Sequence, residues 1–270
     1  MRWLGLLLIL GASLALADPA ADRERMRDFY AKRFPDVPLA AHVDGAYALN
    51  ADAREQWLEL EDFPPYEFAV DEGEALFAES FADGAGYLDC FGSERIKHDY
   101  PVFDEVRGSV VTLEMALNDC RVAHGEDALA YDSEEMAVLM AYLAMQSRDE
   151  VISIDLPDSP AALAAYQEGK RFYQSRRGQL DFACSHCHVQ IVGHNLRAEM
   201  LSASLGHVSH WPVYRLKWQE VGTLHRRFQE CNSQVGAEPL DQQSDAYRNL
   251  EYFLTIMSNG IVWNGPGTRK

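Results

Sequence analysis

The chain has 270 residues, of which 47% are hydrophobic and 24% charged, and its formal net charge at pH 7 is -18. This length can bury a sizeable core and suggests two compact units. The strong negative charge disfavours nucleic-acid binding and attraction to anionic surfaces, so an anionic substrate would need a locally basic pocket.

The first 17 residues have the pattern of a secretory signal peptide. Arg2 gives the positive start, an apolar run follows, and residues 15–17 read Ala-Leu-Ala, a small-x-small cleavage site. A membrane anchor is the alternative, but the run is short for a bilayer span and no later stretch approaches 18 apolar residues. We therefore expect a cleaved signal peptide over residues 1–17 and an exported, periplasmic chain with no membrane span in its mature form.

Helical periodicity dominates the rest of the chain. Segments 71–82, 133–146, 160–176 and 244–258 repeat apolar residues every three or four positions, several behind Ser, Asp or Pro start signals. Residues 35–66 instead contain four prolines and few clean periods. We expect them to form a loop-rich N-terminal extension packed on the first domain.

An internal repeat organises the chain. Residues 100–147 align with residues 211–258 at a constant offset of 111, with twelve identities in 48 positions and no gap. Such self-similarity indicates two similar structural units, and the proline-rich stretch DLPDSP between them marks a boundary. We predict a mainly α protein in which residues 18–152 hold the extension and the first domain, and residues 153–270 the second domain.

The second domain contains the motif CSHCH. In c-type cytochromes the two thiols of such a motif bond to haem and the adjacent histidine ligates the iron. A thioredoxin-like dithiol would need a βαβ setting, which this helical sequence lacks. The other alternative is a zinc site, with Cys184, Cys187 and two further ligands from His186, His188, His194 or Cys231. The spacing favours one covalent haem c, held by Cys184 and Cys187 with His188 on the iron.

The repeat also divides the remaining cysteines. Cys90 stands opposite Cys184, but Ser93 and Glu94 occupy the places of the second haem cysteine and the histidine. The first domain therefore lacks the residues that attach haem. Its Cys90 and Cys120 would lie on opposite sides of an empty haem site, close enough after collapse to form a disulfide that replaces the cofactor as a cross-link.

Cys231 corresponds to Cys120 at the repeat offset, so it should face the haem of the second domain as the distal axial ligand. A thiolate ligand would lower the reduction potential relative to the methionine of ordinary electron-transfer cytochromes. A buried apolar cysteine is the alternative, and the competing ligands are Met200, His207 and Met257. The pattern of the last helix places Met257 on its core face.

With these residues in view, the sequence resembles the SoxA family of cytochrome subunits. The resemblance covers nearly the whole chain after the signal peptide, and depends on the tandem cytochrome-like domains, on CSHCH and on the segment RRFQECNSQVGAEPL. Many members of that family hold a haem in each domain. The segment CFGSE at residues 90–94 departs from them and matches the single-haem branch.

The resemblance implies a specific activity. Members of the family are L-cysteine S-thiosulfotransferases, which oxidatively couple thiosulfate to a cysteine of the sulfur carrier SoxYZ and pass electrons through haem. They pair with the small cytochrome SoxX in the periplasm. By the same resemblance, Cys231 would be the catalytic haem ligand that is also found as a persulfide, and Arg227 would bind the substrate.

The residues around Arg227 are consistent with that role. Arg227 precedes Cys231 by four positions, and i and i+4 side chains share a helix face. A guanidinium can hold sulfonate oxygens by paired hydrogen bonds, although a solvated arginine beside Glu230 is the alternative. The matching residues for Arg226 and Arg227 in the first domain are Met115 and Ala116. The arginines and the haem motif are therefore absent together.

Two other classes of protein remain open from the sequence. One is a low-potential electron carrier without transferase activity, in which Cys231 only tunes the haem. The other is a binding module cross-linked by zinc.

Overall fold

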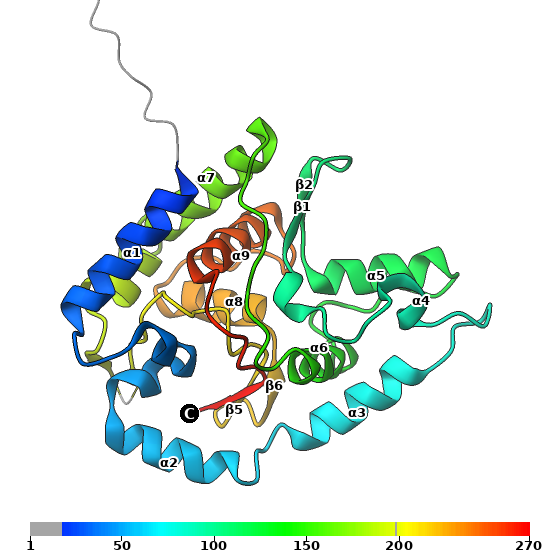
Figure 1. The fold of residues 1–270 in the computed structure, drawn as a ribbon, viewed down its shortest axis with the longest axis horizontal. Helices are drawn as coiled ribbons and strands as arrows, with labels where there is room; N and C mark the ends of the chain where they lie inside the picture. Colours follow the sequence, from blue (N-terminus) through cyan, green and yellow to red (C-terminus); the bar gives the residue numbers. More distant parts are fainter. Residues whose placement is uncertain (1–17, 198) are drawn as a thin grey trace, which may run out of the picture.

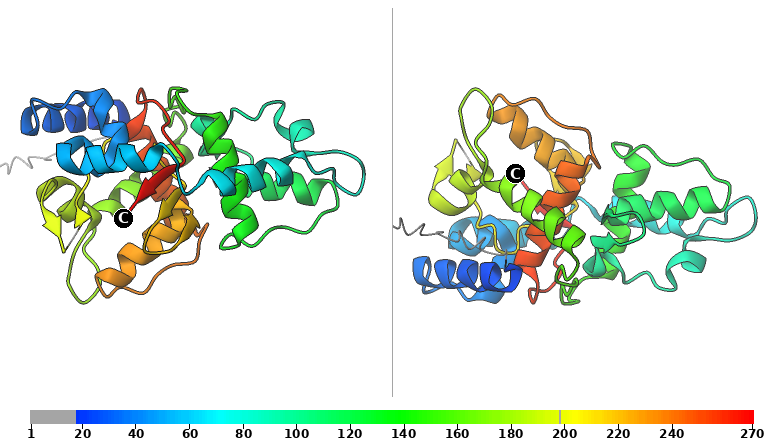
Figure 2. Two further views of the ribbon diagram at one scale, coloured as in Figure 1. Left: turned by 90° about the horizontal axis from the view of Figure 1, so that it is seen from below. Right: turned by 90° about the horizontal axis from the view of Figure 1, so that it is seen from above.

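The computed structural model describes residues 18 to 270 with the exception of residue 198. Helices dominate it, and the strands are short. Figure 2 shows an elongated molecule, with residues 67–146 at one end and the N-terminal and C-terminal helices at the other. The proposed signal peptide lies outside the described residues. Among the helices of the described part, none has the length and apolar character that a membrane span needs.

Most helices begin where the sequence signals place them. Asp18, Asn50, Ser133 and Ser159 each accept a hydrogen bond from the backbone N–H three residues later. The helices are α1 (Pro19–Arg33), η1 (Leu39–Leu49), α2 (Ala51–Glu61), α3 (Glu67–Ala78), α4 (Tyr87–Phe91), η2 (Lys97–Asp99), α5 (Leu113–Ala123), α6 (Glu134–Gln146), α7 (Pro160–Gln174), η3 (His186–Gln190), α8 (Leu224–Gln234) and α9 (Asp245–Ser258).

The strands form two hairpins and one small sheet. They are β1 (Val102–Asp104), β2 (Ser109–Val111), β3 (Asn195–Leu196), β4 (Glu199–Met200), β5 (Val213–Arg215), β6 (Glu220–Gly222) and β7 (Gly267–Arg269). Strands β1 and β2 pair antiparallel, as do β3 and β4. In the third sheet β5 lies between antiparallel β6 and parallel β7.

The repeat of 111 residues is confirmed by the bounds of the elements. Strands β1 and β2 become β5 and β6 at that offset, and α5 becomes α8 without a shift at either end. Helices α6 and α9 start at the same register, and Thr112 and Thr223 cap α5 and α8 in the same way. The two halves are therefore structural copies, with α3 packing on α6 as α7 packs on α9 (Figure 1).

Each of these two helix pairs crosses at a glycine. A Cβ at Gly73 of α3 would lie 2.1 Å from the carbonyl oxygen of Val138 in α6. A Cβ at Gly169 of α7 would lie 1.9 Å from the carbonyl oxygen of Asn249 in α9. Both distances are too short for any side chain, so glycine is what lets the backbones touch. The close crossing fixes the frame that carries the rest of each domain.

The N-terminal extension contains more helix than its prolines suggest. Helices η1 and α2 occupy most of residues 35–66, because Pro38 precedes η1 while Pro64 and Pro65 follow α2, where proline interrupts no helix. The prediction that residues 35–66 pack on the first domain is wrong for most of the segment, because α2 contacts β7 of the second domain. Tyr66, at the end of the segment, does pack on Ala137 and Ala141 of α6. Helix α1, which precedes the segment, lies along α9. Tyr30 of α1, fully buried, provides one reason for this placement, since its apolar neighbours belong to the extension and the second domain.

Four ionisable side chains are buried where the two domains meet. Lys97 and Glu114 come from the first domain, His225 and Glu251 from the second, and each is at most 4% exposed. Lys97 Nζ lies 3.5 Å from Glu251 Oε1, and His225 Nε2 lies 3.1 Å from Glu251 Oε2. Burial raises the pKa of Glu114, whereas Lys97 and His225 outweigh burial at Glu251 and lower its pKa. This cluster joins the domains, because removing one partner would leave a buried charge uncompensated.

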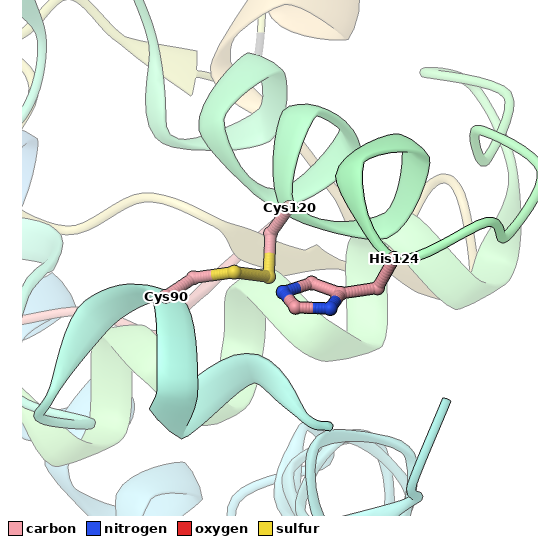
Figure 3. A group of neighbouring side chains, drawn as sticks. All are labelled: Cys90, Cys120 and His124. Atoms are coloured by element: carbon pink, nitrogen blue, oxygen red, sulfur yellow. A yellow bond between two sulfur atoms is a disulfide. The ribbon is translucent and has the colours of Figure 1, made fainter. Parts of the chain in front are cut away.

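The predicted disulfide between Cys90 and Cys120 is confirmed. It links α4 to α5 across the first domain, between positions 30 residues apart. The imidazole of His124 lies beside the two sulfurs (Figure 3). Its Nδ1 is 2.8 Å from Oδ2 of Asp83. Because both sulfurs are bonded to each other, this cysteine and histidine group does not hold a metal in the oxidised protein.

Replacing Cys90 by serine should lower the free energy of unfolding of the first domain by about 3 to 4 kcal/mol, the loop-closure contribution of a cross-link of this length. Urea unfolding followed by circular dichroism measures the loss. The expected haem spectrum should stay unchanged, because the CSHCH motif lies in the other domain. Recovery of both cysteines in alkylated form from unreduced protein would contradict the disulfide.

Candidate functional site

Helix α1 holds the backbone of the CSHCH motif in place. The motif runs into the short turn η3, where the N–H of Ala183 donates to His186 Nδ1 at 2.8 Å. The hydroxyl of Tyr30 donates to the carbonyl oxygen of His188, and the N–H of Ser204 donates to the Tyr30 oxygen at 3.1 Å. Tyr30 of α1 therefore positions the candidate metal-binding histidine.

His188 presents one ring nitrogen for ligation. Its Nδ1 lies 2.8 Å from the carbonyl oxygen of Ser202, which can only accept, so Nδ1 carries the hydrogen and Nε2 is left to bind a metal. Burial lowers the pKa of His188 to about 4, which keeps the imidazole neutral at pH 7. A neutral imidazole oriented by such a hydrogen bond is the usual state of a metal-binding histidine.

Three free thiols converge on this region. Cys184, Cys187 and Cys231 are all unbonded. Burial raises the pKa of Cys184 to about 12, and the neighbouring Cys231 adds to the effect; the same two causes raise the pKa of Cys187. Cys231 of α8 therefore lies near both thiols of the motif. Two attachment thiols, a neutral imidazole and a third thiol are a donor set that fits haem c.

The zinc alternative finds no support in the geometry. A tetrahedral zinc ion needs its ligand atoms within one small sphere. Within residues 18–197 and 199–270, one group of three histidine, cysteine or carboxylate side chains has its ligand atoms within 4.8 Å of one another. It consists of Cys90, Cys120 and His124. Cys184, Cys187, His188 and Cys231 form no such group.

Arg227 and Cys231 share one face of α8, as their spacing predicts. The side chain of Arg227 is only 19% exposed and forms an ion pair with Glu230, so it is not a solvated arginine. Burial acts to lower the pKa of Arg227, but Cys231 and Glu230 outweigh it and raise that pKa. A permanent positive charge therefore lies beside the thiol.

Arg226 points away from this site. Its guanidinium carbon lies 4.4 Å from the ring centre of Trp218, and its Nη2 lies 2.6 Å from Oε1 of Glu220. Successive helix positions point about 100° apart, so the two arginines reach different surfaces. This difference makes Arg226 a matched control for Arg227.

Two further cations join Arg227 around Glu230. Lys217 Nζ lies 2.5 Å from Oε1 of Glu230, and Arg215 Nη1 lies 3.4 Å from its Oε2. Burial acts to raise the pKa of Glu230, but Lys217, Arg227 and Arg215 outweigh it and lower that pKa to about 2. The acidic chain thus carries a local basic cluster next to Cys231, of the kind that an anionic substrate requires.

The competing axial ligands are less well placed than Cys231. The ring of His207 packs against the ring of His188, with centroids 4.3 Å apart, so it lies on the side that His188 already occupies. Met257 is 1% exposed within the core of the second domain, as predicted. Met200 pairs with Asn195 in the hairpin of β3 and β4. This arrangement favours Cys231.

The fold and the site define a class of protein, a c-type cytochrome with tandem domains. A family model described as "SoxA/TsdA, cytochrome c domain" matches residues 72–152, which lie in the half without CSHCH. A protein of Allochromatium vinosum named "L-cysteine S-thiosulfotransferase subunit SoxA" is 49% identical over 99% of this chain and 98% of its own length. A protein of the same name from Chlorobaculum tepidum is 48% identical over 95% of this chain and 89% of its own length.

Solved structures give the same result. The crystal structure of SoxXA from P. pantotrophus matches with a TM-score of 0.72 and 26% sequence identity, covering 80% of this chain and 84% of that one. This chain therefore belongs to the SoxA family. The resemblance seen in the sequence, the mainly α tandem cytochrome fold and the haem c cofactor are confirmed.

The sequence did not reveal three contributors to the site. The Tyr30 hydroxyl donates to a backbone carbonyl, and Ser202 contributes its own backbone carbonyl. Contacts of this kind leave no periodic or motif signal in a sequence. Glu230 was visible only as a neighbour of Arg227, because Arg215 and Lys217 reach it from another strand and turn. The repeat could have drawn attention to it, since the matching residue in the first domain is Asp119, which pairs with Arg107.

Replacing Cys231 by methionine should retain the haem but convert a thiolate-type low-spin spectrum into a histidine and methionine one. The reduction potential should rise, because a thioether donates less charge to iron than a thiolate does. Electron paramagnetic resonance and a redox titration measure the two changes. Met257→Leu is the control and should leave both unchanged; an unaltered spectrum in Cys231→Met would assign the ligand to another residue.

Proposed function

We propose that this protein is the catalytic subunit of a periplasmic L-cysteine S-thiosulfotransferase. It couples thiosulfate to a cysteine of a SoxYZ-like carrier protein and works with a SoxX-like small cytochrome. One observation carries the proposal: Arg227 and Cys231 share a face of α8 next to the CSHCH segment. The relatives named above support it over most of their length.

The proposed haem site contains one haem c per chain. Cys184 and Cys187 would attach it, while His188 and Cys231 would ligate its iron. The first domain lacks the second cysteine and the histidine of a haem motif, and its Cys90 is bonded to Cys120. Cys231 is also the residue on which we expect a persulfide.

The chemistry sets the task of each side chain. Coupling thiosulfate to a cysteine thiol forms one S–S bond and releases one proton and two electrons. Haem c, when bound, supplies the acceptor for electrons. Arg227 binds the sulfonate oxygens of thiosulfate through its planar guanidinium and turns the terminal sulfur toward Cys231. Burial of Arg227 strengthens this contact, because few waters compete for its N–H groups.

The electron-carrier alternative is less well supported. A carrier needs a haem and a suitable ligand, but has no use for a basic cluster beside that ligand in a chain of net charge -18. The relatives that match most of the chain are named as thiosulfotransferase subunits and not as electron carriers.

Intact-mass measurement of the exported protein should show one covalent haem on a chain that begins at Asp18. The reason is the single CSHCH motif and the disulfide in the other domain. Two haems, or a haem-free chain containing zinc, would end this assignment. The same spectrum reports any additional sulfur on Cys231.

Replacing Arg227 by alanine should reduce turnover with thiosulfate and a carrier cysteine by about a hundredfold, since a charge-assisted bidentate contact contributes a few kcal/mol. Arg227→Lys should recover only part of this loss, because an ammonium keeps the positive charge but lacks the paired, planar N–H donors of a guanidinium. Steady-state kinetics measure both, and the haem spectrum should remain normal in each. Arg226→Ala is the control and should have a small effect. Wild-type turnover in Arg227→Ala would refute the substrate-binding role.

A further inference from the structure

Glu230 is placed so that it meets any anion that approaches Arg227. Its Oε2 contacts Arg227 and lies 3.4 Å from Arg215 Nη1, while its Oε1 lies 2.5 Å from Lys217 Nζ. The carboxylate is 15% exposed, so little water screens these contacts. It therefore occupies one side of the guanidinium that the proposed function assigns to thiosulfate.

The three cations differ in how much each depends on Glu230 as a partner. Arg215 is 5% exposed and also binds Oε1 of Glu199 at 2.7 Å and the carbonyl oxygen of Lys270 at 2.9 Å. Lys217 is 59% exposed and can be solvated. If Glu230 turned away from Arg227, its carboxylate would keep Lys217 and Arg215 as partners. Arg227 can thus be released to a ligand without leaving Glu230 uncompensated.

We propose that Glu230 is a positioning residue that competes with bound anions for Arg227 and so promotes release of the product. The inference rests on the proposed function, in which Arg227 binds the sulfonate end of thiosulfate. The competitor is always present, because Glu230 follows Arg227 by three residues on the same helix and meets it as an i, i+3 neighbour.

The charge change during the reaction gives this competition a direction. Thiosulfate carries two negative charges, whereas the sulfonate of the coupled product, written RS–S–SO3⁻, carries one. The balanced step is RSH + S2O3²⁻ → RS–S–SO3⁻ + H⁺ + 2e⁻. A dianion is attracted to the cluster more strongly than a tethered carboxylate is, but a monoanionic sulfonate is not. Glu230 therefore yields Arg227 to the substrate and regains it from the product.

The test removes the charge of Glu230 and keeps its shape. In Glu230→Gln holoprotein, the dissociation constant of methanesulfonate, a monoanionic probe for the product end, should fall about tenfold, as expected when a partly buried competing charge is removed. The dissociation constant of thiosulfate should fall by a smaller factor, because the dianion already displaces Glu230 from Arg227 in the wild-type protein. Isothermal titration measures both. In turnover assays the KM for thiosulfate should fall, and methanesulfonate should inhibit at a correspondingly lower concentration.

Three variants complete the design. Glu230→Asp keeps the charge and should retain wild-type affinity for methanesulfonate, whereas Glu230→Ser should behave like Glu230→Gln. Glu220→Gln is the matched control, since Glu220 pairs with Arg226 on the other surface of α8, and it should change neither affinity. Unchanged methanesulfonate affinity in both Glu230→Gln and Glu230→Ser would overturn this inference alone. Unchanged thiosulfate affinity in Arg227→Ala would instead overturn the proposed function.

Discussion

Two close helix crossings support everything else in this molecule. Backbone contact at Gly73 and at Gly169 lets α3 meet α6, and α7 meet α9, at distances that any side chain would prevent. The crossing in the second domain fixes α9, which packs beside α8 through Tyr247 and Phe228. Helix α8 then carries Arg227 and Cys231. The chemistry therefore depends on a contact at Gly169, which itself takes no part in it.

The two domains share this helix arrangement but use their cysteines differently. In the second, the CSHCH turn and α8 carry three free thiols and a neutral imidazole. In the first, the corresponding cysteines Cys90 and Cys120 are bonded to each other. The buried cluster of Lys97, Glu114, His225 and Glu251 joins the two domains, and Glu114 and His225 occupy equivalent positions of α5 and α8. The first domain thus helps to support α8 through this cluster.

The repeat explains why so much could be predicted from one sequence. A constant offset places equivalent residues at equivalent points, so the disulfide followed from the repeat. The shared face of Arg227 and Cys231 followed from helix geometry. The packing of residues 35–66 did not follow, because no periodicity in this segment shows that α2 contacts β7 of the second domain. The gathering of Arg215, Lys217 and Arg227 on Glu230 also escaped prediction, since contacts between a helix and a distant strand and turn depend on tertiary structure.

The disulfide of the first domain has a consequence for the maturation of the protein. A disulfide needs only an oxidising compartment, whereas a covalent haem needs delivery of a cofactor and a ligation reaction. The covalent closure of the first domain therefore does not wait for a cofactor. Lys97, which that domain contributes, is the partner of Glu251 in the second domain, so the disulfide also stabilises one side of the contact between the domains.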